Sequence, residues 1–81
     1  MNSMIIKSTK DLYGRNAVEL VQSLTPFKSN IYLNIEGRRV NLKSILGLLS
    51  AGVRKETTIK IEILEDDELE EIHNTIKKFF N

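Results

Sequence analysis

The chain has 81 residues, enough for one small domain, and carries a formal net charge of +1. This near-neutral balance gives no global attraction to nucleic acid or to a membrane surface, so neither is expected as a direct partner. The absence of cysteine excludes disulfides, thiolate metal sites and cysteine nucleophiles. No apolar run approaches the roughly 20 residues of a membrane span, and the N-terminus lacks a signal-peptide pattern, so we expect a cytoplasmic protein.

The first third of the sequence predicts a strand followed by an amphipathic helix. Residues 3–8 (SMIIKS) form a short, mostly apolar run. From Gly14 the apolar residues recur at i, i+3, i+4 and i+7, which is one face of a helix. Pro26 disfavours helical backbone at the residue before it, so we expect this helix to end near Leu24 or Thr25.

The stretch YGRNAVEL, residues 13–20, has the composition of a phosphate-binding loop at the start of that helix. Gly14, Arg15 and Asn16 would place a flexible backbone, a guanidinium group and free N–H groups near a bound anion. The loop contains no histidine, cysteine or serine that could carry a phosphate covalently. We expect Asn16 and Glu19 to form a variant of a capping box.

Residues 30–42 predict a β-hairpin. NIYLNI alternates apolar and polar residues, and RRVNL reads as the returning strand. Glu36 and Gly37 between them predict a tight turn, because Gly37 can adopt a positive φ at little steric cost. The two arginines of the returning strand indicate a sheet edge or a surface that faces a partner.

A short helix is expected between Ser44, a natural N-cap, and Gly52, a natural C-terminal stop. Its large apolar residues lie on more than one face: Ile45, Leu46, Leu48 and Leu49. Full burial of all of them is hard to arrange in so small a domain, so we expect this helix to contact a partner.

The C-terminal third predicts a strand at residues 57–64 (TTIKIEIL) and a last helix capped by Asp66 or Asp67. The buried stripe of that helix is expected to comprise Leu69, Ile72, Ile76 and Phe79. The element order is then β-α-β-β-α-β-α in a single domain, residues 1–81. Four strands backed by helices on one face form a two-layer α+β sandwich.

Residues suited to catalysis or metal binding are few. His73, the only histidine, falls on the expected solvated face of the last helix, so we assign it no role. No Walker loop, GxGxxG pattern, catalytic triad or metal-spaced set is present. The acidic run EDDELEE is explained by an ordinary helix start. We therefore expect a protein that is not an enzyme and needs neither cofactor nor metal.

Ser44 is the strongest single candidate for chemistry. Its hydroxyl would lie at a helix N-terminus, where free backbone N–H groups and the helix dipole stabilise an added phosphate. Basic residues that serve either solubility or a partner bracket the same helix: Arg38, Arg39, Lys43, Arg54 and Lys55.

The run RRVNLKSILGLLSAGV closely resembles the regulatory-serine region of the histidine-containing phosphocarrier protein family, HPr, of the sugar phosphotransferase system. The matching residues are Gly37, Val40-Asn41-Leu42-Lys43-Ser44-Ile45, Gly47, Ser50 and Gly52. The match is strong over some 16 residues, and element order and length extend it over nearly the whole chain. The resemblance implies the HPr open-faced sandwich, with a four-stranded antiparallel sheet and three helices.

An ungapped register from Ser44 sets residues 13–17 (YGRNA) against the family's active-site motif His-Ala-Arg-Pro-Ala. Arg15 and Ala17 match, whereas Tyr13 stands at the position of the phosphorylated histidine and Asn16 at that of the proline. A tyrosine phosphate is an ester of much lower transfer potential than a phosphohistidine, so relay from phosphoenolpyruvate to sugar should fail. The resemblance is thus to a degenerate HPr, similar in logic to catabolite-repression HPr.

The resemblance also implies partners. Ser44 matches the serine that the HPr kinase/phosphorylase phosphorylates, and the phosphoserine form of the family binds a catabolite control repressor. The implied partner-binding residues are Arg15, Lys43, Ile45, Leu46 and Leu49. An Enzyme I-like surface without phosphotransfer is a further possibility.

Two other hypotheses remain open at this point. The chain could be an HPr-like interaction domain that is never phosphorylated, in which Ser44 is only a cap and the patch of Leu46 and Leu49 binds another partner. Alternatively, a ferredoxin-like domain could bind a small anion, or act as an acylphosphatase, through Gly14, Arg15 and Asn16.

Overall fold

The computed structural model describes residues 1–81, which form four strands and three helices in the expected order. The elements are β1 (Asn2–Lys7), α1 (Gly14–Leu24), β2 (Ile31–Ile35), β3 (Arg38–Asn41), α2 (Ile45–Ala51), β4 (Thr58–Ile63) and α3 (Leu69–Phe80). Every boundary lies within two residues of the prediction, because proline, glycine and capping residues mark most of the ends.

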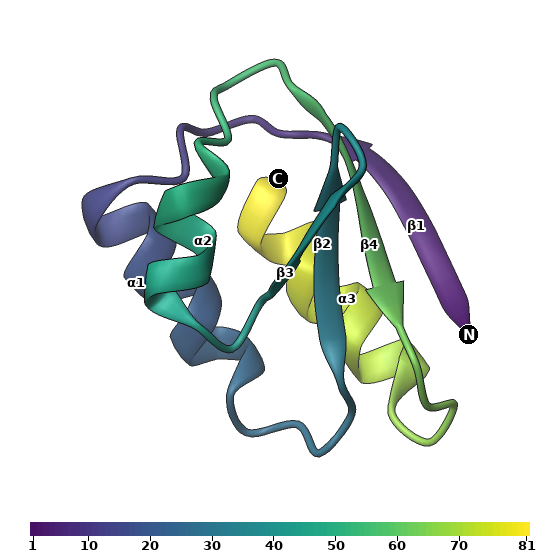
Figure 1. Cartoon of the computed structure of the whole chain (residues 1–81). Helices are drawn as coiled ribbons and strands as arrows, with labels where there is room; N and C mark the ends of the chain where they lie inside the picture. The colour runs from purple at the N-terminus through teal and green to yellow at the C-terminus, as the bar shows by residue number, and fades with distance from the viewer.

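The sheet has the strand order β1-β4-β2-β3, and all neighbouring strands are antiparallel. The two crossovers through α1 and α2 bring β4 between β1 and β2, so β1 and β3 form the two edges. Figure 1 shows α1 and α2 side by side, with α3 running behind the sheet. The predicted edge position of the arginine-rich strand β3 is confirmed.

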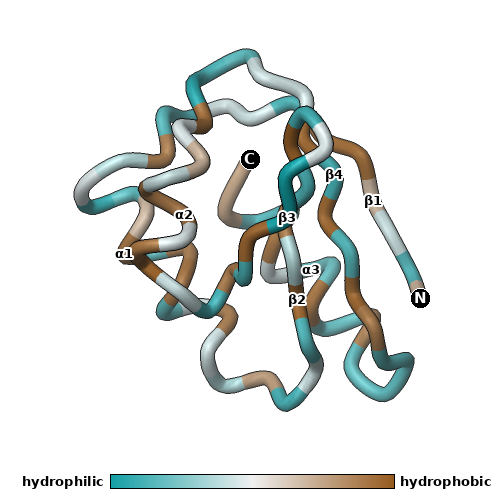
Figure 2. The backbone as a smooth tube through the Cα atoms, viewed as in Figure 1, coloured by the Kyte–Doolittle hydropathy of each residue, from teal (hydrophilic) through white to brown (hydrophobic).

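One face of the sheet supplies half of the hydrophobic core. The isoleucines of β4 are buried, and they lie beside the buried residues of β2. The helices cover this face with apolar residues that are almost completely buried: Ala17, Leu20, Val21, Leu24, Leu48, Ile72 and Ile76. Figure 2 shows brown, apolar residues along the helices and strands of both layers. The predicted two-layer α+β sandwich is therefore confirmed.

The turn between β2 and β3 has the predicted form. Glu36 and Gly37 both have positive φ, 51° and 80°, as a type I′ turn requires. Glycine adopts such a backbone freely, whereas glutamate is strained there. The right-handed twist of the two strands matches this turn and maintains the strained residue.

The start of α1 differs from the expected capping box. Tyr13 is the N-cap residue, its side chain makes no capping hydrogen bond, and Gly14 has a φ of +49°. Asn16 therefore lies inside the first turn, where its side-chain amide donates 3.0 Å back to the carbonyl of Asp11. The predicted capping pair of Asn16 and Glu19 was wrong, because the helix begins three residues earlier than a cap at Asn16 requires.

The start of α3 also differs from the expectation. The N-cap residue is Glu68, and neither Asp66 nor Asp67 caps the helix. Asp66 instead accepts a 2.6 Å hydrogen bond from the side-chain amide of Asn2, at the far end of β1. This tertiary contact draws the aspartate away from the helix start, and local sequence rules contain no information about it.

The stripe predicted for α3 is correct at its centre and shifted at its end. Ile72 and Ile76 are buried and Leu69 is partly buried, but Phe80 is buried where Phe79 was expected. The two rings pack edge to face with centroids 4.9 Å apart. Because of this packing, one phenylalanine fills the core while Phe79 stays half-exposed beside α1. None of the three helices has the length and apolar character needed to cross a bilayer.

Candidate functional site

Tyr13 lies at the junction between the start of α1 and the end of α2. The Leu12 N–H donates 2.9 Å to the carbonyl of Val53, which joins the two segments directly before α1 and after α2. The Tyr13 hydroxyl lies 4.0 Å from where a Cβ on Gly52 would stand. Tyr13 is 43% exposed. The segment that begins α1 is therefore exposed at the surface, with the phenol of Tyr13 at its N-cap.

Arg15 is the free cation of this surface. Its side chain is exposed and takes part in no ion pair and no hydrogen bond. It follows Gly14 directly, so it lies on the same outer end of α1 as Tyr13. A free guanidinium can hold phosphate or carboxylate in a bidentate manner.

Ser44 caps α2 as predicted. Its hydroxyl oxygen accepts a hydrogen bond of 3.0 Å from the N–H of Gly47, and its carbonyl accepts one of 3.0 Å from the N–H of Leu48. Gly52 ends the helix in the left-handed conformation, with φ 65° and ψ 37°. The first turn of α2 contains no acidic residue. The serine hydroxyl therefore lies in a locally positive backbone field.

Gly47 matters for the space around that hydroxyl. A Cβ at Gly47 would lie 3.3 Å from the Ser44 hydroxyl oxygen and 3.4 Å from its Cβ. Such contacts are tighter than ordinary van der Waals packing, so a larger residue would crowd the serine side chain. The glycine that interrupts the apolar run thus leaves the hydroxyl room at the helix start.

Three exposed apolar side chains follow Ser44 on the outer side of α2, and we name them the α2 apolar patch: Ile45, Leu46 and Leu49. Leu46 is 80% exposed, while Ile45 and Leu49 are each 38% exposed. Leu48 and Ala51 fill the core from the opposite side of the helix. The prediction that this helix cannot bury all of its apolar residues is confirmed. An exposed cluster of this kind is typical of a protein-docking surface.

Tyr13 and Ser44 are at opposite ends of the patch. Tyr13 is next to the C-terminal end of α2 and Ser44 caps its N-terminal end, so α2 separates them by about 10 Å at 1.5 Å per residue. The α2 apolar patch lies between them, and a single protein partner could cover all three.

Two of the basic residues around α2 donate hydrogen bonds to the chain's own backbone. The Arg38 guanidinium donates 3.0 Å to the carbonyl of Ala51 and so binds the C-terminal end of α2. The Lys43 ammonium donates to the carbonyl of Phe27. Lys43, predicted as a partner-binding residue, therefore has its charge directed at the chain's own backbone.

Arg39 lies on the other face of the sheet, away from the helices. Its guanidinium stacks on the ring of Tyr32, 4.0 Å from the centroid, and pairs with the carboxylate of Glu62 at 3.1 Å. Lys60 lies 3.9 Å from the same carboxylate. These contacts explain how Glu62 is buried on an open sheet face, and they leave Arg39 outside the surface formed by α1 and α2.

His73 is not on a fully solvated face, as the sequence had suggested. The side chain is half-buried, and its Nε2 is shielded from solvent without a hydrogen-bond partner. The apolar stripe of α3 gave no indication of this burial. No cluster of three or more histidine or acidic residues has the geometry of a metal site.

Two carboxylates that sequence reasoning took for an ordinary helix start have a specific role. Glu68 accepts hydrogen bonds from the N–H of Lys28 and from the N–H and hydroxyl of Ser29, at 2.8–2.9 Å. Glu65 accepts from the backbone and side chain of Asn30. Hydrogen bonds from the Ser29 hydroxyl and then its backbone lower the pKa of Glu68, and those from the Asn30 backbone and then its side chain lower the pKa of Glu65.

Comparisons with known proteins agree with this geometry. The chain matches the family model PTS-HPr, described as the PTS HPr component phosphorylation site, over residues 2–81. It is 34% identical over 67 residues to the phosphocarrier protein HPr of Xylella fastidiosa, covering 83% of this chain and 75% of that protein.

Solved structures show the same similarity. HPr-C-His from Thermoanaerobacter tengcongensis superposes with a TM-score of 0.88 at 30% identity, covering 99% of this chain and 91% of that one. Crh, a catabolite repression protein of Bacillus subtilis, superposes with a TM-score of 0.71 at 30% identity, covering 90% and 87%. The fold is thus the open-faced sandwich of these proteins, and the ferredoxin-like alternative is not supported.

Proposed function

Because the chain belongs to the HPr family of the phosphotransferase system, we propose that it is a regulatory member that cannot relay phosphate through histidine. In this proposal the HPr kinase/phosphorylase phosphorylates Ser44, and the product acts as a protein-interaction module in carbon catabolite control. One observation carries the proposal: the Ser44 hydroxyl caps α2, and the first turn of this helix carries the exposed side chain of Leu46.

The loss of the relay is supported by the residues that occupy the relevant places. Tyr13, whose side chain ends in a phenol and not in an imidazole, stands at the N-cap of α1. Its phosphate would be an ester with too low a transfer potential to pass to a sugar carrier. His73 lies on α3, and its Nε2 is shielded from solvent, so it offers no replacement nucleophile there.

Phosphorylation at Ser44 is supported by the environment of its hydroxyl. Transfer of the γ-phosphoryl group of ATP to the hydroxyl oxygen releases ADP and a proton. The N–H of Gly47, which already donates to that oxygen, can then donate to a phosphate oxygen. Phosphate at a helix N-terminus is stabilised by the helix dipole, and no acidic side chain in the first turn opposes it.

The partner surface follows from the same placement. A catabolite control repressor would contact the α2 apolar patch with its own apolar side chains and bind the adjacent phosphoserine with basic ones. Arg15 supplies a free cation at the far end of the surface, and the proposal keeps an Enzyme I-like contact there without phosphotransfer. The likeness to Crh, a catabolite repression protein, also favours this assignment.

Two parallel labelling reactions test the proposal. With HPr kinase/phosphorylase and ATP we expect one phosphate per chain, located at Ser44 by mass spectrometry and absent in Ser44→Ala. Ser50→Ala is the matched control, because Ser50 is an exposed hydroxyl on the same helix whose loss should leave labelling unchanged. With Enzyme I and phosphoenolpyruvate we expect no label; a labelled chain would disprove the loss of the relay.

A second candidate function has its own supporting observation. The Ser44 hydroxyl already acts as a cap through its bond with Gly47, which is sufficient to explain a serine there. In that case the α2 apolar patch would bind a partner that ignores phosphate. Partner binding that is unchanged in Ser44→Ala and Ser44→Asp but lost in Leu46→Asp would favour this candidate over the first.

A further inference from the structure

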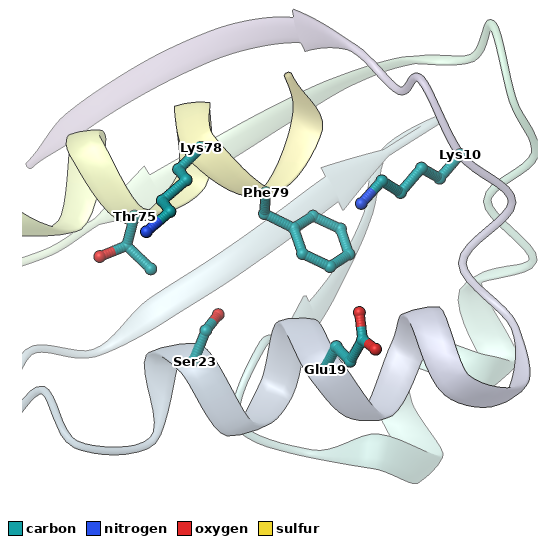
Figure 3. A pocket seen from close by; sticks show the side chains of 6 residues that line it. All are labelled: Lys10, Glu19, Ser23, Thr75, Lys78 and Phe79. Atoms are coloured by element: carbon teal, nitrogen blue, oxygen red, sulfur yellow. The ribbon is translucent and has the colours of Figure 1, made fainter.

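A hollow between α1 and α3 lies outside the surface formed by α1 and α2. It has a volume of about 490 Å³, within the range of roughly 300–1,000 Å³ usual for small-molecule sites. Figure 3 shows the six side chains that surround it: Lys10, Glu19, Ser23, Thr75, Lys78 and Phe79. Five of these six are polar, and none belongs to α2 or to the α2 apolar patch.

Three charged groups face this hollow without an ion-pair partner. Lys10, Glu19 and Lys78 take part in none of the salt bridges of the molecule. The Lys10 ammonium lies 4.1 Å from the centroid of the Phe79 ring, which holds the cation over the hollow. In Figure 3 the lysines come from opposite sides of the hollow, and the Glu19 carboxylate rises from α1 toward Phe79. Two cations and one anion therefore surround a single open space.

The two hydroxyl groups that line the hollow both donate hydrogen bonds within their own helices. Ser23 donates to the carbonyl of Leu20, and Thr75 donates to the carbonyl of Glu71, at 2.7 and 2.8 Å. Their protons are thereby used within their own helices, and their oxygens remain as acceptors. A ligand that satisfies them must bring hydrogen-bond donors of its own. The carboxylate of Glu19 likewise needs a hydrogen-bond donor from the ligand.

We infer that this hollow binds a small phosphorylated polyol of the size of a monosaccharide phosphate. The phosphate would pair with the ammonium group of Lys78, and a ligand oxygen at the other side of the hollow would accept a hydrogen bond from Lys10. The ligand's hydroxyls would donate to the Glu19 carboxylate and to the oxygens of Ser23 and Thr75. The half-exposed edge of Phe79 offers an apolar surface for the ligand's C–H groups. A free anion would leave the acceptor oxygens without donors, and an uncharged polyol would leave the ammonium group of Lys78 without an anion.

An NMR titration of the ¹⁵N-labelled full chain tests the inference with glucose 6-phosphate as the probe. We expect saturable shifts at the backbone amides of Lys10, Ser23, Thr75 and Phe79, and none at the α2 apolar patch. Glucose alone and inorganic phosphate alone are the two comparison ligands, and each should bind at least about tenfold more weakly because it satisfies only one set of groups.

Matched variants locate the site. Lys78→Gln and Glu19→Gln should each weaken binding of glucose 6-phosphate by about tenfold, because each removes a charged hydrogen-bonding partner. Lys77→Gln removes the same charge from the neighbouring exposed position and should leave the affinity unchanged. An equal loss in Lys77→Gln, or equal binding of inorganic phosphate, would overturn the inference, as would the absence of saturable shifts. The outcome is independent of Ser44 phosphorylation, so it does not depend on the proposed function.

Discussion

At the scale of single residues, the side chain of His73 holds a nitrogen that the fold leaves unpaired. Its Nε2 is buried and has no hydrogen-bond partner, although the periodic pattern of α3 predicted a solvated side chain. A buried polar atom without a partner loses its hydration and gains nothing in return. The residue therefore weakens the fold at a position where an apolar side chain of similar size would fit.

We predict that His73→Leu raises the free energy of unfolding by about 1 kcal/mol, because it removes the unsatisfied nitrogen and keeps the bulk of the side chain. Urea denaturation followed by circular dichroism measures the change. Asn74→Leu, at an exposed neighbouring position, controls for the gain in helix propensity alone. If both variants gain equally, or if His73→Leu is less stable than the parent chain, the interpretation of the nitrogen is wrong.

Ser44 and Tyr13 differ in how much of their surroundings could be predicted from the sequence. The N-cap role of Ser44 depends on residues three positions apart, so its hydrogen bond with Gly47 could be predicted. The position of Tyr13 beside Gly52 depends on two distant segments meeting through Leu12 and Val53. Only the family resemblance pointed to it beforehand.

At the scale of elements, the β2–β3 hairpin combines a correct prediction with a strained residue. The turn was expected from Glu36-Gly37, and both residues do adopt positive φ. A glutamate in this conformation is less stable than an asparagine, which the type I′ turn prefers at the same position. The strands β2 and β3 are held in register from Tyr32–Asn41 to Ile35–Arg38, so the turn cannot relax without breaking their pairing.

We therefore predict that Glu36→Asn stabilises the chain by about 0.5–1 kcal/mol, measured as an increase in the urea midpoint at unchanged m-value. Glu36→Ala is the control: it removes the same charge but keeps a residue that resists positive φ, and should give no gain. A midpoint that rises equally in both variants would assign the effect to charge instead of backbone strain.

In helix α2, the neighbouring elements decide which apolar residues are buried and which are exposed. Its composition predicted excess apolar surface, and the exposed fraction of Leu46 confirms that prediction. Which of the leucines would be buried followed from its packing against α1 and β3, where Leu48 points into the core. The patch that remains is what we assign to a protein partner.

At the scale of the whole molecule, two glutamates join distant parts of the chain. Glu65 and Glu68 hold the backbone N–H groups of residues 28–30, which connect α1 to β2, against the segment that leads into α3. The hydrogen bonds favour the ionised carboxylates, and they lower the pKa of both side chains from the ordinary value of 4.5.

This linkage predicts how stability depends on pH. Between the lowered pKa values and pH 4.5, the unfolded chain binds more protons than the folded chain, so stability rises with pH in that window. Above it the contribution is fully present, and it is lost as the pH falls through the folded pKa values. Glu68→Gln should flatten the slope of unfolding free energy against pH in this range.

Urea titrations at several pH values between about 3 and 7 measure this slope. Glu70→Gln provides the matched control, because Glu70 lies on the same helix, is exposed and makes no hydrogen bond. The slope of that variant should equal that of the parent chain. A slope that stays unchanged in Glu68→Gln would show that the carboxylate does not contribute through its ionised form.

The sequence by itself determined the elements, the hairpin turn, the caps of α2 and the buried faces of most elements, because these depend on residues a few positions apart. Its motif around Ser44 also determined the family resemblance. Only the tertiary structure decided the start of α3, the exchange of Phe79 for Phe80, the burial of His73 and the hollow between α1 and α3. These features arise where residues distant in sequence meet, as Asn2 meets Asp66, and no local pattern records such a meeting.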